Sequence, residues 1–162
     1  MRVLGVDPGQ TGALAVVDDG WLLDLIDMPT GPVRVGKATR TRIIPELLAE
    51  VIRRLLPLDI AYVEKVSAMP KQGVSSTFVF GQGHGLVLGT LAAFRVRTEL
   101  ITPQAWRKLA AVRGAKKDGS RHRACQLFRN QVEKFARVKD ADRAEAALIA
   151  YAGTLKEKGE GK

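Results

Sequence analysis

The sequence contains a single cysteine, Cys125, so an internal disulfide is excluded. Its neighbours Ala124 and Leu127 favour a small buried hydrophobic residue in a helix over a nucleophile. No apolar run reaches the roughly 20 residues that a membrane-spanning helix needs. The N-terminus shows no basic-then-apolar signal pattern either, so we expect a soluble, cytoplasmic protein.

The chain also lacks an internal repeat and any change of composition that would mark a second domain. Its 162 residues are enough to bury a hydrophobic core without disulfides. We therefore expect one domain over residues 1–157, followed by a polar tail at residues 158–162.

Acidic residues are outnumbered, with 17 Asp and Glu against 26 Lys and Arg, and the net charge is +9. Residues 95–139 alone contain 13 Lys and Arg and only 3 acidic residues, so the excess is concentrated there. A solvated basic face would explain this pattern. The alternative is a polyanionic partner, most simply nucleic acid.

Short apolar runs bounded by turn residues predict five strands. The first three cover residues 3–7, 13–17 and 21–26, and the Asp-Gly turn before the third favours an antiparallel meander. Residues 60–64 and 95–101 predict the other two. A helix over residues 43–56, which ends at Pro57, implies a crossover to a parallel neighbour.

The other segments alternate between loops and helices. Residues 30–42 are rich in glycine, proline and basic residues and predict a loop, whereas residues 75–94 have the apolar content of a helix. In the last third we expect a short turn at residues 103–109, a loop at 113–119, and helices over 120–135 and 140–155.

Glycines recur every four residues in the helix at 75–94, at Gly81, Gly85 and Gly89. This stripe indicates tight packing against a neighbour. The segment around it lacks the Lys-Ser/Thr ending of a phosphate loop, and its spacing does not fit a dinucleotide fingerprint. His84, in the same segment, is expected to be a packing or hydrogen-bonding residue instead of a metal ligand.

Four carboxylates stand at positions that a plain core would not favour. Asp7 and Glu64 each end an apolar strand, and they lie close together if the two strands are neighbours. Asp142 and Glu145 are three residues apart and share one face of the last helix, Glu145 within the apolar stripe and Asp142 at its edge. Asp140 points away and is expected to be a cap or a solvated charge.

Each of these carboxylates has an ordinary explanation, as a solvated strand end or as the partner of one of the many arginines and lysines. Together they predict a site for a divalent metal, because hard oxygen ligands suit Mg²⁺ and Mn²⁺. A basic domain would bring phosphates to that metal.

Four segments, in order, resemble the motifs of RuvC-type Holliday junction resolvases, members of the RNase H-like superfamily. They are VLGVDPGQTG at residues 3–12, AYVE at 61–64, FGQGHG at 80–85 and DRAEAALIA at 142–150. The resemblance implies an α/β, RNase H-like fold with a five-stranded mixed sheet flanked by helices. It also implies a homodimer that cuts two opposing strands of a four-way DNA junction symmetrically.

The same resemblance assigns roles to individual residues. Asp7, Glu64, Asp142 and Glu145 match the metal-binding carboxylates, and Lys116 and Lys117 resemble the basic residues that contact the scissile phosphate. Our hypothesis is that the four carboxylates hold two Mg²⁺ ions about 4 Å apart and that hydrolysis leaves a 5′ phosphate. Either lysine could stabilise developing negative charge, and we count Lys117 among the catalytic residues; the alternative is that both are ordinary solvated loop lysines.

Two positions depart from the bacterial pattern. Glu145 stands where Asp is usual, as in the phage and prophage-type members that this sequence resembles more closely. Ser67 stands where bacterial members carry an aromatic wedge, and Met69 and Phe78 are the candidates for that role.

Four further basic residues are predicted to contact DNA phosphates: Arg107, Lys108, Arg121 and Arg123. Trp106 lies among them at a helix start and is expected to pack in the core.

Three other functions compete with the resolvase prediction. The opening motif also resembles the first phosphate loop of the actin and sugar-kinase superfamily, but this chain is too short for the two domains of that group. A nuclease acting on other branched or replication-fork DNA, and a non-catalytic DNA-binding module, both stay open.

Overall fold

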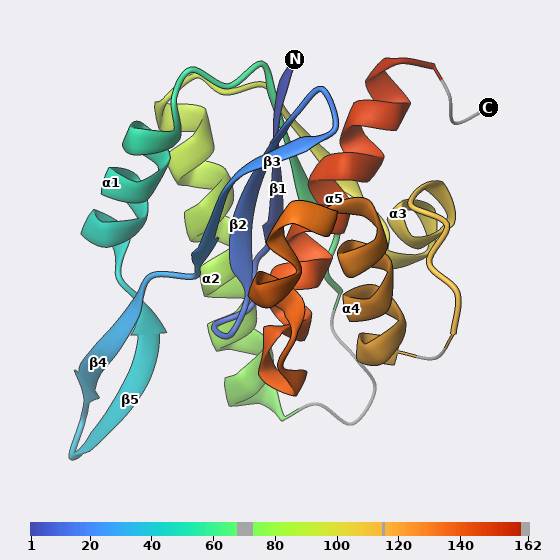
Figure 1. The fold of residues 1–162 in the computed structure, drawn as a ribbon. Coiled ribbons are helices and arrows are strands. Elements are labelled where there is room, and N and C mark those ends of the chain that lie inside the picture. The colour runs from blue at the N-terminus through green and yellow to red at the C-terminus, as the bar shows by residue number, and fades with distance from the viewer. Residues whose placement is uncertain (68–72, 115, 160–162) are drawn as a thin grey trace.

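A five-stranded mixed sheet is built from β1 (Arg2–Asp7), β2 (Ala13–Asp18), β3 (Trp21–Asp27), β6 (Ile60–Glu64) and β7 (Thr98–Ile101). The computed structural model describes residues 1–67, 73–114 and 116–159, with the backbone alone at Lys116 and Lys117. The strand order is β3-β2-β1-β6-β7, with β1 at the centre (Figure 1). Strands β1 to β3 are antiparallel, and β6 is parallel to both β1 and β7. The predicted α/β architecture is confirmed.

The tight turn between β2 and β3 follows from its sequence. Asp19 and Gly20 have φ angles of 45° and 86°, the two positive values that a type I′ hairpin requires. Asp-Gly is a preferred pair for this turn, which is why the meander could be predicted locally.

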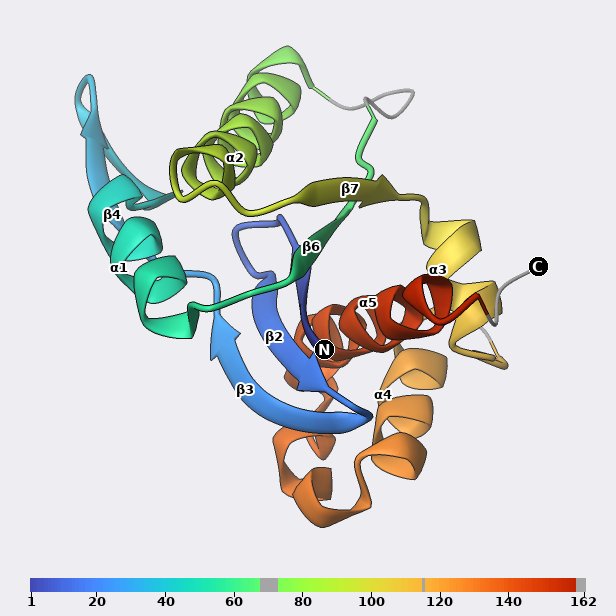
Figure 2. The same ribbon diagram turned by 90° about the horizontal axis from the view of Figure 1, so that it is seen from above.

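Helices cover both faces of the sheet. On one face lies α5 (Ala141–Glu157), flanked by α3 (Pro103–Leu109) and α4 (Lys116–Leu127). On the other lie α1 (Pro45–Leu55) and α2 (Val74–Ala93) (Figure 2). Successive residues of a strand point to opposite faces, so Val3 joins the α5 core while Leu4 and Val6 join the α1–α2 core.

Helix α5 lies close to the sheet because there is a glycine on each side of the contact. Gly5 of β1 faces α5, and Gly153 of α5 faces β6. A Cβ atom at Gly5 of β1 would overlap the backbone of Ala146 and Ala150 on α5. A Cβ at Gly153 of α5 would overlap the ring of Tyr62 on β6. This contact fixes the position of α5, and with it the acidic residues of its first turns.

Residues 30–42 do not form the predicted loop. They form a two-stranded hairpin of β4 (Thr30–Val35) and β5 (Ala38–Ile43), turned at Gly36 and separate from the main sheet (Figure 1). The prediction was wrong because β5 alternates threonine with arginine and β4 contains Gly31 and Pro32, so neither strand has the apolar run that marks a buried strand.

The last third also differs from its prediction. α4 already begins at Lys116, inside the expected loop, and ends at Leu127, after which two 3-10 turns follow, η1 (Arg129–Phe135) and η2 (Val138–Asp140). The chain kinks here, because Phe128 (φ −107°, ψ 59°) and Gln131 (φ −140°, ψ 29°) have non-helical backbone angles. Both the Phe128 and Phe135 rings are buried, with their centroids 6.0 Å apart.

The other boundaries shift slightly. β7 begins at Thr98 and not at Arg95. Arg95 has a φ of 55°, which is outside the β region, and it belongs to the turn that follows α2. None of the helices in the described ranges combines the length and apolar content needed to cross a bilayer.

Glycines 81, 85 and 89 do not pack tightly within the chain. A Cβ atom built at any of the three would meet nothing within 4 Å, so the expected close neighbour is absent among the described residues. Gly83, on the opposite side of α2, is the one close to a neighbour, Cδ1 of Ile43 at 3.1 Å.

Candidate metal centre

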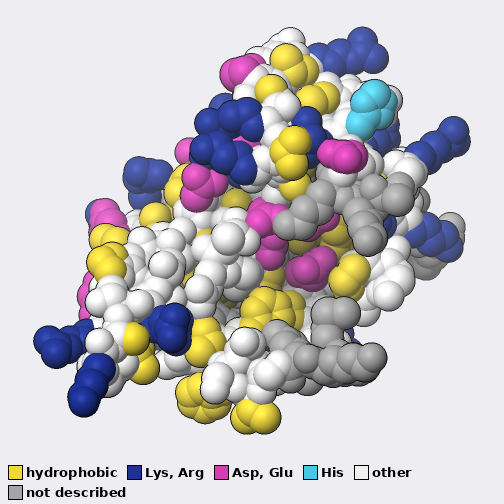
Figure 3. Space-filling view, turned by 90° about the horizontal axis from the view of Figure 1, so that it is seen from below, with side chains coloured by type: hydrophobic (Ala, Val, Ile, Leu, Met, Phe, Trp, Pro, Cys, Tyr) yellow, Lys and Arg dark blue, Asp and Glu magenta, His cyan; other side chains and the backbone are white. Residues whose placement is uncertain are grey.

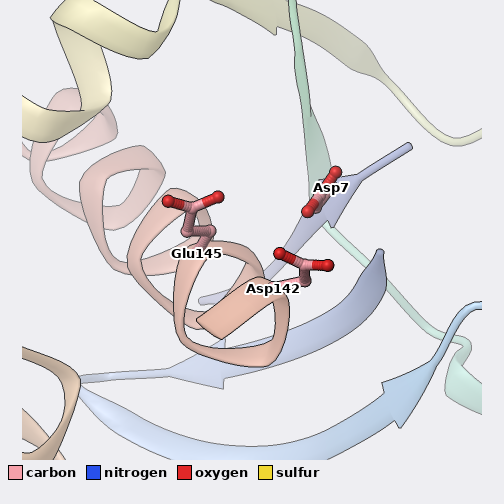
Figure 4. Close-up of side chains that lie close together, drawn as sticks. All are labelled: Asp7, Asp142 and Glu145. Atoms are coloured by element: carbon pink, nitrogen blue, oxygen red, sulfur yellow. The ribbon is translucent and has the colours of Figure 1, made fainter. Parts of the chain in front are cut away.

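Three of the four predicted carboxylates come together at one end of the sheet. Asp7, Asp142 and Glu145 each place a carboxylate oxygen within 4.8 Å of the others (Figure 4). Asp7 comes from the last position of β1, and the other two come from the first two turns of α5. A strand end and a helix start separated by more than 130 residues thus converge on one point.

A tight turn after β1 fixes the direction of Asp7. The Gly9 N–H donates to Asp7 Oδ1 at 3.1 Å, and the Gly12 N–H donates to the Gly9 carbonyl at 3.0 Å. A Cβ at Gly12 would overlap the carbonyl oxygen of Asp7, so only glycine allows the chain to return so closely.

Glu64 lies beside this cluster. Its strand runs parallel to β1 with Val63 opposite Val6, which places Glu64 next to Asp7 in the register. Its Oε1 accepts a hydrogen bond of 2.8 Å from the indole Nε1 of Trp106. Burial raises the pKa of the Glu64 carboxyl, and the Trp106 N–H acts in the opposite direction.

The carboxylates of the cluster repel one another, and the burial of Asp7 adds to the cost of its charge. Burial, and after it the charges of Asp142, Glu64 and Glu145, raise the pKa of Asp7 to about 7, against the lowering effect of the Gly9 N–H. A carboxyl in such a place ionises readily only when a cation compensates it. The donor set, all carboxylate oxygens, is the type that Mg²⁺ and Mn²⁺ prefer.

Two solved structures of RuvC are similar to this chain along almost its whole length. T. thermophilus RuvC in complex with a Holliday junction substrate has a TM-score of 0.68 at 20% sequence identity, covering 99% of this chain and 96% of that chain. The chain has the RuvC fold. A Thermus thermophilus RuvC structure gives a TM-score of 0.61 at 18% identity and covers 100% and 99% of the two chains.

At these identities the comparison establishes the RuvC fold alone. No protein-family profile matches the chain, and no curated protein matches it in sequence.

Within the RuvC fold, two residues outside the predicted set support the carboxylates. Ser120 is completely buried and donates from Oγ to Glu145 Oε1 at 3.1 Å, while Arg107 Nη1 donates to Ser120 Oγ at 3.0 Å. Trp106, correctly expected to pack in the core, is 1% exposed and also holds Glu64. A serine in a basic helix gives no sequence signal of such a contact.

The predicted phosphate-contacting residues lie in different environments. Arg107 Nη1 is 3.9 Å from Glu145 Oε1 and therefore belongs to the support of the carboxylates. Arg121 donates to the carbonyls of Phe135 and Ala136, and Arg123 donates to the carbonyl of Ala110. Lys108 is exposed. Phosphate contact by these four residues stays a prediction.

The remaining predicted residues are less fully defined. Lys116 and Lys117 form the start of α4, and their side chains lie outside the described part of the structure. Ser67 is exposed just after β6, Met69 lies outside the described residues, and Phe78 is 72% exposed on α2.

Two further predictions can be compared with the structure. The His84 ring is partly buried, and burial lowers its pKa against a hydrogen bond with the backbone of Glu64. Asp140 is not a solvated charge, because it is 1% exposed and accepts hydrogen bonds from the backbone and side chain of Arg137.

Proposed function

We propose that this protein is a divalent-metal-dependent endonuclease that resolves four-way DNA junctions by paired, symmetric cuts. The observation that carries the proposal is the convergence of Asp7, Asp142 and Glu145 at the end of a RuvC fold. A similar structure holds a Holliday junction substrate, and the motifs of the sequence resemble the same family.

Asp7, Asp142 and Glu145 would hold the metal, with Glu64 beside them as a further ligand. Bound Mg²⁺ or Mn²⁺ supplies activation of a water nucleophile and stabilisation of the leaving oxygen in phosphodiester hydrolysis. The raised pKa of Asp7 supports the assignment, because a bound cation would offset the burial and the neighbouring negative charges that raise it.

The surrounding residues orient the carboxylates. Ser120, held by Arg107, fixes one oxygen of Glu145, and Trp106 fixes one oxygen of Glu64. Lys116 and Lys117 begin α4 and would stabilise the negative charge that develops on the scissile phosphate. The products would carry a 5′ phosphate.

The DNA would be held by exposed basic residues around the acidic cluster, Lys108 among them. Figure 3 shows acidic side chains gathered near the middle of the face that carries the site, with Lys and Arg toward its ends. Two matched cuts in one junction require two active sites, which a homodimer with a two-fold axis supplies. The Glu145 position supports a closer relation to phage-type members.

A second substrate, other branched or replication-fork DNA, is favoured by one observation. Ser67 is exposed where bacterial members carry the aromatic wedge, so recognition of the junction centre would differ here.

The test is cleavage of a labelled synthetic four-way junction beside linear duplex and Y-shaped DNA, with Mg²⁺, Mn²⁺ or chelator. Paired symmetric nicks on the junction alone, and only with metal, are expected. Preferential cutting of the Y-shaped DNA would replace the substrate, and tight junction binding without cutting under either metal would leave a DNA-binding module.

A further inference from the structure

The β4–β5 hairpin is a basic arm that the function proposed above does not use. Between Met28 and Pro45 the sequence contains no acidic residue and four basic ones, Arg34, Lys37, Arg40 and Arg42. Its two strands pair only with each other among the described strands, so the arm extends away from the sheet (Figure 1). Its charge therefore faces solvent and not the core.

The register of the hairpin sorts these cations onto two faces. Arg40 lies opposite Val33 and Arg42 lies opposite Gly31, so both arginines share one face of the ribbon. Arg34 lies opposite Thr39 and belongs to the other face.

The face with Arg40 and Arg42 borders a groove of about 630 Å³ between the hairpin, the turn after β1 and the start of α2. An adjoining groove of about 300 Å³ continues along Val33 and Val35 of the hairpin. The residues of the larger groove that matter here are Pro8, Gly9, Arg40, Arg42, Ser75 and Ser76.

The groove is adjacent to the acidic cluster, because two of its lining residues, Pro8 and Gly9, directly follow Asp7 in the chain. Its described lining combines two guanidinium groups with the hydroxyls of Ser75 and Ser76, and it includes no carboxylate. Guanidinium and hydroxyl donors are the groups that contact phosphate and sugar oxygens of DNA. The phosphates of a DNA strand that extends from the acidic cluster into the groove would pair with the two guanidinium groups.

The groove lies on the opposite side of the cluster from α3 and α4. Both ribbon views place the hairpin and these helices at opposite sides of the molecule (Figures 1 and 2). The predicted phosphate-contacting residues all lie on the α3–α4 side. None of them would therefore contact a DNA strand on the hairpin side of Asp7.

We propose that the β4–β5 hairpin is a DNA-binding arm, in which Arg40 and Arg42 hold the phosphate backbone of the strand that leaves the acidic cluster through this groove. The inference rests on the proposed nuclease function and extends it to a surface that only this arm provides. Since each phosphate contact releases counterions, removing two of them should weaken binding and reduce its salt dependence.

The experiment compares the wild-type protein with the double variant Arg40→Gln/Arg42→Gln. Binding of a fluorescent four-way junction is measured by anisotropy in chelator at several NaCl concentrations. We expect Kd to rise by roughly 10-fold or more near 0.1 M salt, and the slope of log K against log salt to fall by about two.

A matched control removes the same charge elsewhere. Arg54 on α1 and Lys158 after α5 are exposed cations away from the groove, so Arg54→Gln/Lys158→Gln should change Kd far less. Equal weakening in both double variants, or unchanged binding in the arm variant, would overturn the proposal. Melting curves of both variants confirm that the fold is retained.

Cleavage with Mg²⁺ is measured separately on the same junction. If the wild-type protein binds the junction through the arm but cuts no DNA, the nuclease proposal fails while the arm stands. If cutting occurs and the arm variant binds normally, the arm proposal fails alone.

Discussion

Ser120 Oγ lies 3.1 Å from Glu145 Oε1, and the serine side chain is completely buried. The same hydroxyl accepts a hydrogen bond from Arg107. The Ser120 hydroxyl therefore links the guanidinium group of Arg107 to the carboxylate of Glu145. Such supporting contacts fix the orientation of metal ligands, and their loss typically lowers metal affinity or activity.

Replacing Ser120 with alanine should therefore lower the cleavage rate by about 10- to 100-fold and raise the Mg²⁺ concentration needed for half-maximal rate. Glu145 would lose one oriented oxygen, and Arg107 would lose its acceptor. A rate titration with Mg²⁺ measures both effects.

Thr154→Ala is the control for loss of a buried hydroxyl. Thr154 is 2% exposed and donates to the Ala150 carbonyl in its own helix, far from the carboxylates. Identical metal dependence of the two variants would show that Ser120 contributes only to stability.

Trp106→Phe should move the acidic limb of the pH–rate profile to higher pH. The indole N–H lowers the pKa of Glu64, so its removal leaves the effect of burial opposed only by the charge of Arg107, and the carboxyl ionises at higher pH. Rates of junction cleavage from pH 5 to 9 measure the shift. Trp21→Phe, at a side chain that is 65% exposed, should leave the profile in place, and a profile unchanged in both variants would contradict the assignment.

The metal-free protein should lose stability as pH rises from about 4 to 7, in part through Asp7. Its carboxyl has an ordinary pKa of 3.8 when unfolded and a pKa of about 7 when folded. Between these values the folded state keeps a proton that the unfolded state has lost, so stability falls with rising pH and levels off above pH 7.

Melting temperatures of the wild type and Asp7→Asn in chelator, taken from pH 4.5 to 8, isolate this effect. The melting temperature of Asp7→Asn should rise relative to that of the wild type as pH increases. A constant difference in melting temperature between the two proteins would contradict the raised pKa. Adding Mg²⁺ should stabilise only the wild type, most strongly at the higher pH.

Asp7→Asn should also lower cleavage by roughly three orders of magnitude, since loss of a metal ligand removes several kcal/mol of transition-state stabilisation. Junction binding in chelator should be retained. Glu46→Gln, at an exposed carboxylate of α1, is the control and should cut normally. Loss of binding together with cutting in Asp7→Asn would instead mean that Asp7 is needed for the fold.

Gly5→Ala should destabilise the protein by about 1 to 3 kcal/mol, because the added methyl would force β1 and α5 apart. Urea unfolding of the purified protein measures the change. Gly89→Ala is the matched comparison, since its methyl meets open space in the interior of α2 and should be neutral or stabilising by up to about 1 kcal/mol. Equal destabilisation by both substitutions would argue against the close contact at Gly5.

Much of the site could be predicted because its signals are local. Asp7 and Glu64 end apolar strands, and Asp142 and Glu145 share a helix face, so periodicity alone indicated where each carboxylate would stand. The structure brings Asp7, Asp142 and Glu145 within 4.8 Å of one another and leaves Glu64 beside them, held by Trp106.

The supporting residues and the arm could not be predicted in this way. Ser120 is 25 positions from Glu145, and Trp106 is 42 positions from Glu64. Nothing in either segment indicates which carboxylate it will meet. The sequence of the hairpin predicts a loop, because its glycine, proline and basic residues do not resemble a strand that packs in a core.

The sequence by itself therefore determined the α/β order of elements, the tight turns and the four carboxylate positions, since each depends on hydrophobic period or turn chemistry within a few residues. Only the tertiary structure decided that α3 and α4 support two of these carboxylates and that a basic hairpin extends from their edge. Those relationships join segments that are far apart in the sequence, as Ser120–Glu145 and Trp106–Glu64 do, and no local pattern encodes such contacts.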